Sequence, residues 1–231
     1  MARAARSIEK TCGRIPLVSG HSKWATIKRD KGANDAKRGA IFTKLCNAIT
    51  IAVRQGRGLP LALDKAKAAN MPKENIQRAL DRGEGKLAGQ QLVESTFEGF
   101  GPGGVAIIIE TISDNNTRTA QFIHTVFEKN GGHLATPGSV SYLFSRVGAI
   151  EEQTLEKAME VEALDFDEGT IYTKPEDLHK ISEALGKQGS LIYRPNKETL
   201  VNLNPEDQEK LEKLLEAIDD LDDVQEVYVN V

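Results

Sequence analysis

Hydrophobic positions in the first third of the chain recur at the spacing of an α-helix. Asn34 is a suitable N-cap, and an apolar stripe follows it at i, i+4, i+7 and i+11. Gly56 ends this helix, and Pro60 and Pro72 suit the first turns of two further helices, the last ending near Gly83. The pattern predicts three helices around one small core. The residues of the stripe are Ile41, Leu45, Ala48 and Ala52.

From residue 93 the pattern changes to that of strands. The segments VESTFEGF and VAIIIETI flank a GPGG turn, which predicts a β-hairpin. The string GFGPGG superficially suggests a dinucleotide-binding loop, but its glycines precede a strand instead of joining a strand to a helix. Asp114 or Asn115 can cap the helix that follows, and Ala120, Ile123 and Phe127 are spaced to form its buried face.

The rest of the chain continues the alternation of strands and helices. GSVSYLFSRVGAIEE predicts extended structure, and a helix near 154–164, a strand at GTIYTK, a helix at 175–186 and a strand from Leu191 follow. Asn204 and Pro205 begin a last helix with leucines on one face, and VQEVYVNV ends the chain as an alternating strand. We therefore predict an α+β fold with sandwich units after the helical segment, one inserted into the other.

Charge divides the chain into two unlike parts. Residues 1–86 contain 19 Lys and Arg against 7 Asp and Glu, a net charge of +12. Residues 87–231 contain 11 against 27, a net charge of −16. Charged side chains often do no more than solvate a surface, but an asymmetry of this size indicates a nucleic-acid or membrane partner. No stretch reaches the roughly 18 apolar residues of a membrane span. The partner that we expect is nucleic acid.

Residues 1–19 carry a basic side chain every three or four positions, and Glu9 is the one acidic residue among them. Apolar residues share another side at the same spacing, without an apolar core of the secretory kind. This pattern is typical of a mitochondrial transit peptide, and a disordered basic tail is the alternative. We expect location in the mitochondrial matrix and exclude this segment from the fold. The basic residues are Arg3, Arg6, Lys10 and Arg14.

Residues before and along the first predicted helix are the main candidates for nucleic-acid contact. Nine basic and two acidic residues lie between Lys23 and Arg57, and such cations supply sequence-independent attraction to phosphate. Trp24 could stack on an unpaired base or anchor its segment to the core. His21 could contact phosphate or cap a turn. The candidates here are His21, Lys23, Trp24, Lys28, Arg29, Lys31, Lys37, Arg38 and Lys44.

Two further candidates lie later in the chain. Lys73 follows Met71 and Pro72 in a turn of the basic part of the chain, residues 1–86. Arg118 lies in the first turn of the helix that Asn115 can cap, where free backbone N–H groups and a guanidinium suit a phosphate. A plainly capped helix with a solvated arginine is the alternative at this second place.

The sequence shows no catalytic constellation. His124, His133 and His179 are scattered, and no Walker loop, nucleophile elbow or metal-binding cluster is present. Cys12 and Cys46 form neither zinc spacing nor a disulfide framework. We therefore expect no enzyme activity, no cofactor, no metal and no small-molecule substrate.

Three long segments resemble the YebC family. They read GHSKWATIKRDKGANDAKRGAIFTKL, KAANMPKENIQRAL and FEGFGPGGVAIIIETISDNNTRTAQFIHTVFEKNGGHLATPGSVSYLF, and the C-terminal DDVQEVYVN also matches. The similarity runs from Gly20 to the end and is loose over 151–203. RQGRGLPLAL is shorter than the family's stretch after the first long helix. The mitochondrial branch of this family includes the translational activator of cytochrome c oxidase.

The resemblance implies three domains. They are a basic helical domain at 20–90, an α/β domain formed by 91–148 and 202–231, and an α/β domain at 149–201 inserted in the second. The resemblance also implies a translation factor that helps the ribosome through stall-prone sequences such as proline runs. Many bacterial members are described as DNA-binding transcriptional regulators.

We therefore expect a mitochondrial translation factor that binds ribosomal RNA, with mRNA or DNA as further candidate partners. The alternative is a DNA-binding regulator, which the lack of a recognisable helix-turn-helix reader or dimerising heptad disfavours. A third hypothesis is a protein-interaction scaffold that uses the acidic part of the chain, residues 87–231, which we call the body. In the leading hypothesis the helical domain anchors the chain, while Lys73 and Arg118 reach toward the functional centre of the ribosome.

Overall fold

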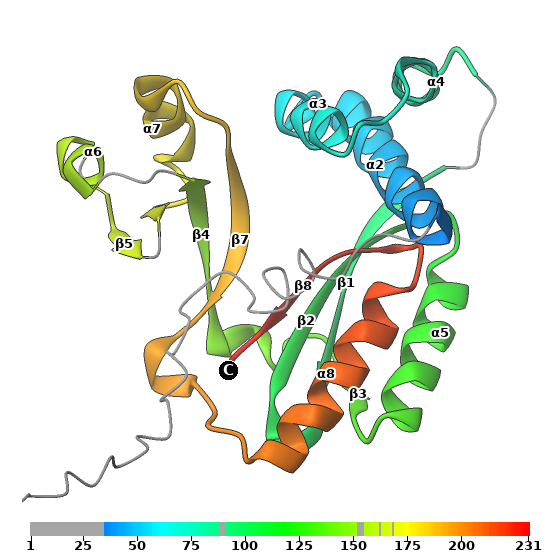
Figure 1. The fold of residues 1–231 in the computed structure, drawn as a ribbon, viewed down its shortest axis with the longest axis vertical. Helices are drawn as coiled ribbons and strands as arrows, with labels where there is room; N and C mark the ends of the chain where they lie inside the picture. The colour runs from blue at the N-terminus through cyan, green and yellow to red at the C-terminus, as the bar shows by residue number, and fades with distance from the viewer. Residues whose placement is uncertain (1–34, 88–90, 152–154, 162, 168) are drawn as a thin grey trace, which may run out of the picture.

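The computed structural model describes residues 35–231, apart from 88–90, 152–154, 162 and 168. These residues form a helical domain and two four-stranded sheets. In Figure 1 the helices α2–α4 lie at one end of the first sheet, and α5 and α8 lie along one side of it. The second sheet lies on the other side and carries α6 and α7.

The helical domain consists of α2 (Asp35–Gln55), α3 (Leu59–Ala68) and α4 (Lys73–Gly83). Small and aliphatic side chains fill its core, in which Ile49, Ala66 and Ala79 are almost completely buried. Asn70 follows α3 with a φ of 55°, a left-handed conformation that asparagine tolerates better than most residues. The chain turns at Asn70 and enters α4 after Pro72. The three predicted helices are therefore confirmed.

The first sheet has the strand order β3-β1-β2-β8, and each neighbouring pair is antiparallel. Strands β1 and β2 form the predicted hairpin through the short 3-10 helix η1, where Gly103 and Gly104 have φ of 70° and 76°. The strands are β1 (Val93–Phe100), β2 (Ala106–Ser113), β3 (His133–Ala135) and β8 (Val224–Val229). The helical elements are η1 (Pro102–Gly104), α5 (Asn116–Lys129) and α8 (Pro205–Asp219).

The second sheet has the order β5-β6-β4-β7 and is also antiparallel throughout. It lies in the sequence between β3 and α8, so its whole unit is inserted into the first sheet's unit. The strands are β4 (Phe144–Glu151), β5 (Asp165–Asp167), β6 (Thr170–Thr173) and β7 (Gly189–Pro195). The helical elements around it are η2 (Ser141–Leu143), α6 (Leu155–Glu160), α7 (Leu178–Leu185) and η3 (Lys197–Thr199).

Strand β2 joins the layers because both of its faces are buried. Ile107 and Ile109 point into the core under α5 and α8, whereas Ala106 and Ile108 point into a second core shared with the other sheet. This explains why its sequence is a continuous apolar run and not an alternating one. Phe144 of the second sheet is buried in the shared core.

The expected α+β fold, with three helices first and one sheet unit inserted in another, is confirmed. Some details differ. Thr119 is buried on α5 where Ala120 was expected, and Ala120 is only half-buried. The 3-10 helix at 141–143 interrupts a stretch predicted to be extended, and β3 and β5 were not predicted. Strand β4 pairs with the second sheet from Phe144 onward, and the domain boundaries at 148/149 and 201/202 stay predictions.

Candidate nucleic-acid interface

Eight of the residues predicted to contact nucleic acid have side chains that the structure does not describe. Six lie outside the described residues, and two more occupy the first turn of α2, of which only the backbone is described. Their role in nucleic-acid binding stays a prediction. The six are His21, Lys23, Trp24, Lys28, Arg29 and Lys31, and the two are Lys37 and Arg38.

Lys44 joins the helical domain to the body. Its Nζ donates to the backbone carbonyl of Asp219 and lies 3.2 Å from the carboxylate Oδ1 of the same residue. The two side chains are only 12% and 18% exposed. The positive charge of Lys44 is therefore offset inside the chain, at the seam between α2 and the end of α8.

Helices α2 and α4 run in the same direction. Thr50 Oγ1 donates to the carbonyl of Ala79 at 3.2 Å, and one turn further Gly83 lies against Val53 so closely that a Cβ there would meet Val53 Cβ at 2.6 Å. A glycine is therefore required where the two helices touch. The shared direction places the C-terminal ends of both helices side by side.

Exposed cations line this pair of helices. Arg54, Lys73 and Arg78 are exposed, and none takes part in an ion pair with another described residue. Lys73 was predicted as a contact residue, whereas Arg54 and Arg78 were not. A signal for both was present in the sequence, because each falls outside the apolar stripe of its helix.

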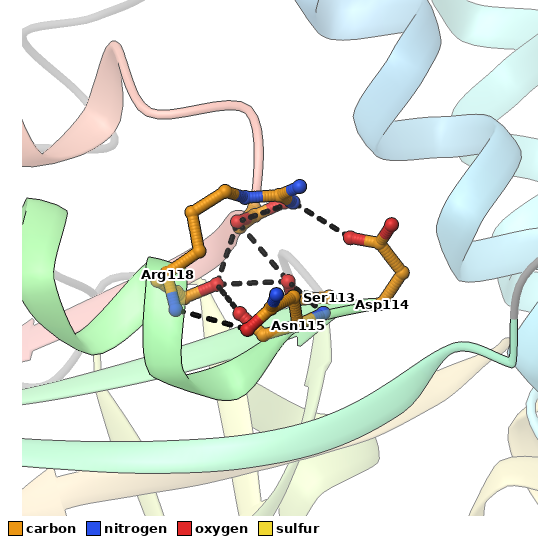
Figure 2. Close-up of polar contacts among 6 residues, drawn as sticks. Ser113, Asp114, Asn115 and Arg118 are labelled. Atoms are coloured by element: carbon orange, nitrogen blue, oxygen red, sulfur yellow. Dashed lines mark hydrogen bonds and ion pairs between the residues drawn. The ribbon is translucent and has the colours of Figure 1, made fainter.

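Arg118 lies in a polar cluster at the start of α5 (Figure 2). Its Nη2 lies 2.6 Å from Asp114 Oδ1 and 3.5 Å from Asp223 Oδ2. Asn115 is the N-cap, since its Oδ1 accepts a hydrogen bond from the backbone N–H of Arg118 at 3.0 Å. The hydrogen bond that Arg118 donates to the Asp114 carboxylate raises the pKa of Arg118. The guanidinium is thus paired with two carboxylates of its own chain.

Asp223 places a negative charge at the N-terminal end of α5. A helix N-terminus of this kind would otherwise attract a phosphate. Its Oδ2 accepts hydrogen bonds from Thr119 Oγ1 at 2.6 Å and from Ser113 Oγ at 3.1 Å. A carboxylate at a helix N-terminus is stabilised by the helix dipole. A nucleic-acid phosphate would have to compete with this carboxylate, and the role of Arg118 in binding stays a prediction.

Glu98 fixes the connection between the two sheets, which we call the junction (residues 136–143 and 196–199). Glu98 is 8% exposed, and its carboxylate accepts three backbone hydrogen bonds, from Gly138 at 2.8 Å, Val140 at 2.7 Å and Ser141 at 3.1 Å. Burial alone would raise the pKa of Glu98, but the hydrogen bonds outweigh it and lower the pKa. The carboxylate thus holds the first junction segment in one conformation.

Asn230 fixes the second junction segment. Its side chain is buried, its Oδ1 accepts from the backbone N–H of Ala106 at 2.8 Å, and its Nδ2 donates to the carbonyl of Thr199 at 2.6 Å. Thr199 Oγ1 in turn donates to the carbonyl of Leu143 at 3.0 Å. The C-terminal strand, the hairpin and both junction segments are therefore tied together by polar contacts.

A further polar contact joins the two sheets directly. Arg146 Nη1 lies 2.8 Å from Glu110 Oε1, and its guanidinium stacks over the ring of Tyr193 with a centroid distance of 4.3 Å. Tyr228 donates to the other oxygen of Glu110 at 3.1 Å. Burial, together with the Glu110 carboxylate, raises the pKa of Tyr228. These groups pair with each other and offer no free reactive centre.

Two other kinds of site are absent from the described residues. In this part of the chain no three His, Cys, Asp or Glu side chains gather closely enough to hold a metal ion. No helix within the same residues has both the length and the apolar character that crossing a bilayer requires. Cys46 lies half-buried beside the core of the helical domain, where burial raises the pKa of its thiol.

Comparison with known proteins identifies the family. Residues 22–86 match the model of the TACO1/YebC protein N-terminal domain, and residues 92–231 match that of the TACO1/YebC second and third domain. A protein of Acidithiobacillus ferrooxidans named "Probable transcriptional regulatory protein" is 44% identical over 238 residues, covering 92% of this chain and 94% of the relative. A Petrotoga mobilis protein of the same name is 46% identical, with the same coverage.

The fold is similar to a solved structure. The crystal structure of a conserved hypothetical protein from Aquifex aeolicus superposes with a TM-score of 0.78 at 41% sequence identity. The match covers 90% of this chain and 96% of that one. Both domain models and these relatives extend over nearly the whole sequence. The chain therefore belongs to the TACO1/YebC family.

Proposed function

We propose that this chain is a translation factor that binds ribosomal RNA through its helical domain. The observation that carries the proposal is the set of exposed cations on α2 and α4, which have no ion-pair partner among the described residues. They belong to the part of the chain with a net charge of +12. Cations without internal partners are free to neutralise phosphates, which is the main source of nucleic-acid affinity.

The negative charge of the body indicates that the helical domain and the body have different roles. It carries a net charge of −16, and in its cluster at α5 the cation Arg118 is paired with carboxylates. Such a surface repels phosphate unless local groups offset the repulsion. The helical domain therefore anchors the protein, and the body projects from the anchor toward the centre of the ribosome.

A second candidate function is transcriptional regulation through DNA. It is favoured by the names of the bacterial relatives, which are called probable transcriptional regulatory proteins. A cationic surface attracts the phosphates of either polymer, so the electrostatics of α2 and α4 fit both functions. We favour RNA because the sequence lacks a recognisable helix-turn-helix reader or dimerising heptad.

The test uses the full chain and purified ribosomes, sedimented at increasing salt. A variant with Arg54→Ala, Lys73→Ala and Arg78→Ala should bind more weakly than wild type. Each lost phosphate contact lowers the slope of log affinity against log salt by about 0.7–0.9, so three reduce it by roughly 2–3. A second variant covers the segment before and within the start of α2, with Lys28, Arg29, Lys37 and Arg38 changed to Ala.

The matched control removes the same amount of charge from exposed lysines of the body, with Lys129→Ala, Lys174→Ala and Lys180→Ala. It should sediment with ribosomes as wild type does. Equal sedimentation of the helical-domain variants and wild type at every salt would refute the helical domain as the docking surface. Parallel titrations with ribosomal RNA and with duplex DNA of equal length separate the two functions, and tighter binding to DNA would favour the regulator.

We further propose that the protein works in the mitochondrial matrix. The support is the spacing of the arginines in residues 1–19, which resembles a transit peptide. A fusion of residues 1–30 to a fluorescent protein should enter mitochondria. A fusion in which Arg3, Arg6 and Arg14 are changed to Ala is the control and should stay in the cytosol. Cytosolic signal from the unchanged fusion would refute the proposed location.

A further inference from the structure

Tyr142 is an exposed aromatic residue whose neighbouring backbone is held by hydrogen bonds. It lies in the 3-10 helix η2 of the junction and is 70% exposed. Among the described aromatic residues only Phe122, at 50%, is also substantially exposed. An exposed tyrosine ring leaves a flat aromatic face accessible to a partner.

The backbone around Tyr142 is held at successive residues. The N–H groups of Val140 and Ser141 donate to the buried Glu98 carboxylate. The carbonyl of Tyr142 itself accepts from Asn196 Nδ2 at 3.2 Å. Because Val140 is completely buried in the core shared by the two sheets, the segment is anchored by packing as well as by hydrogen bonds.

The next residue is fixed in the same way. Leu143 donates its N–H to the carbonyl of Val140 at 2.9 Å, and its own carbonyl accepts from the backbone N–H of Asn196 at 2.9 Å and from Thr199 Oγ1 at 3.0 Å. Because this backbone is already held, presenting the ring to a partner requires little further ordering of the segment, which favours affinity.

We propose that Tyr142 is a stacking platform for an unpaired base of the nucleic acid that the helical domain binds. The inference rests on the proposed function and adds a second contact to it. Base stacking needs one accessible ring face, and it tolerates any base. The junction around the ring is mainly polar. It carries the hydroxyl groups of Thr136, Ser139 and Thr199, the amide of Asn196, the ammonium group of Lys197 and the exposed carboxylate of Glu198.

A nucleic acid fits these surroundings better than a protein partner. The centre of a protein interface is a group of apolar side chains, whereas Tyr142 is the one large hydrophobic residue exposed within 136–146. Lys197, next to Asn196, is 78% exposed and reaches Asp165 only at 3.6 Å. Because an exposed ion pair of this kind is weak, a phosphate beside the stacked base can compete with Asp165 for the ammonium group of Lys197.

The test compares single-stranded RNA with the same sequence as a duplex, using fluorescence anisotropy and the full chain. Tyr142→Ala should weaken binding to the single strand by roughly 5- to 150-fold, the effect of one lost stack, and leave duplex binding unchanged. Tyr142→Phe keeps the ring and should bind as wild type does. Phe122→Ala removes an exposed aromatic on α5 and is the matched control, expected to have no effect.

Several outcomes would overturn the inference. Equal affinity of Tyr142→Ala and wild type for the single strand removes the platform, as does an equal loss on strand and duplex. A photoreactive p-benzoylphenylalanine at position 142 should crosslink to ribosomal RNA, and crosslinks only to protein would assign the ring to a protein interface. If the proposed function itself is wrong, wild type binds neither RNA form and no RNA crosslink forms. This result is distinct from the outcomes that refute only the role of Tyr142.

Discussion

Replacing Glu98 by Ala removes the one acceptor shared by three backbone N–H groups of the junction. A hydrogen bond to a charged group contributes about 1.5–3 kcal/mol, so the three together contribute at most about 4.5–9 kcal/mol. Gly138 is exposed and Ser141 half-buried, so water can reach both N–H groups in the variant. Val140 is fully buried, and its N–H is left without an acceptor.

We therefore expect Glu98→Ala to lower the free energy of unfolding by about 3–4 kcal/mol. Glu98→Gln keeps one acceptor oxygen but loses the charge, and should cost about 1–2 kcal/mol. Urea unfolding followed by circular dichroism measures both losses. Hydrogen exchange read by mass spectrometry should show that protection falls first in residues 136–143, because the lost contacts lie there.

The same contact has a defined pH dependence. The pKa of Glu98 is lowered in the folded protein, so its contribution to stability is complete above the ordinary carboxylate pKa of about 4.3. It is lost as the pH falls from there through the lowered pKa. The stability difference between wild type and Glu98→Gln should therefore be constant above about pH 5 and shrink toward pH 3.

Glu94 provides the control, since it lies on the same strand but is exposed and contacts only the side chain of Gln55 at 2.7 Å. Glu94→Gln should change stability by less than about 0.5 kcal/mol. The reasoning is refuted if Glu98→Ala unfolds at the urea concentration of wild type while the amides of 136–143 keep their protection. That result would mean that packing alone holds the junction.

Three other changes test neighbouring contacts through the same unfolding assay. Asn230→Ala leaves a buried backbone N–H without its acceptor and should cost about 2–3 kcal/mol. Gly99→Ala would place a Cβ 2.6 Å from Cε1 of Phe127, and should cost about 1–3 kcal/mol by overpacking. Asp223→Asn weakens the bonds at the start of α5 and the pairing with Arg118, and should cost about 1–2 kcal/mol with faster hydrogen exchange in the first turn of α5.

Most of the fold could be predicted from the sequence because its elements are long and regularly patterned. The stripe of α2 has helical spacing over more than ten residues, and prolines and glycines mark where the helices end. Strands β3 and β5 escaped prediction because each has three residues, too few to show a period of two. Their pairing is decided by the strand beside them and not by their own sequence.

The polar contacts of the site could not be predicted, because they join residues far apart in the chain. Arg118 looked like a free cation next to a helix start, and only the fold brings Asp223 to it, 105 residues later. Glu98 looked like one acidic residue in a strand, and its acceptor role depends on a loop 40 residues away. By contrast, the exposed positions of Arg54 and Arg78 follow from helical spacing alone.

The segregation of charge also shapes the seam between the helical domain and the body. Lys44 pairs with Asp219 in a largely buried setting, and Lys65 lies 3.0 Å from Glu226 with both side chains about half exposed. An exposed pair of this kind contributes only about 0–1 kcal/mol and weakens with salt, whereas the buried pair is screened much less. Salt therefore weakens the exposed Lys65–Glu226 pair, while the largely buried Lys44 contact continues to join the helical domain to the body. In the proposed function, a loss of ribosome binding at high salt accordingly reports on the phosphate contacts of the helical domain and not on its separation from the body.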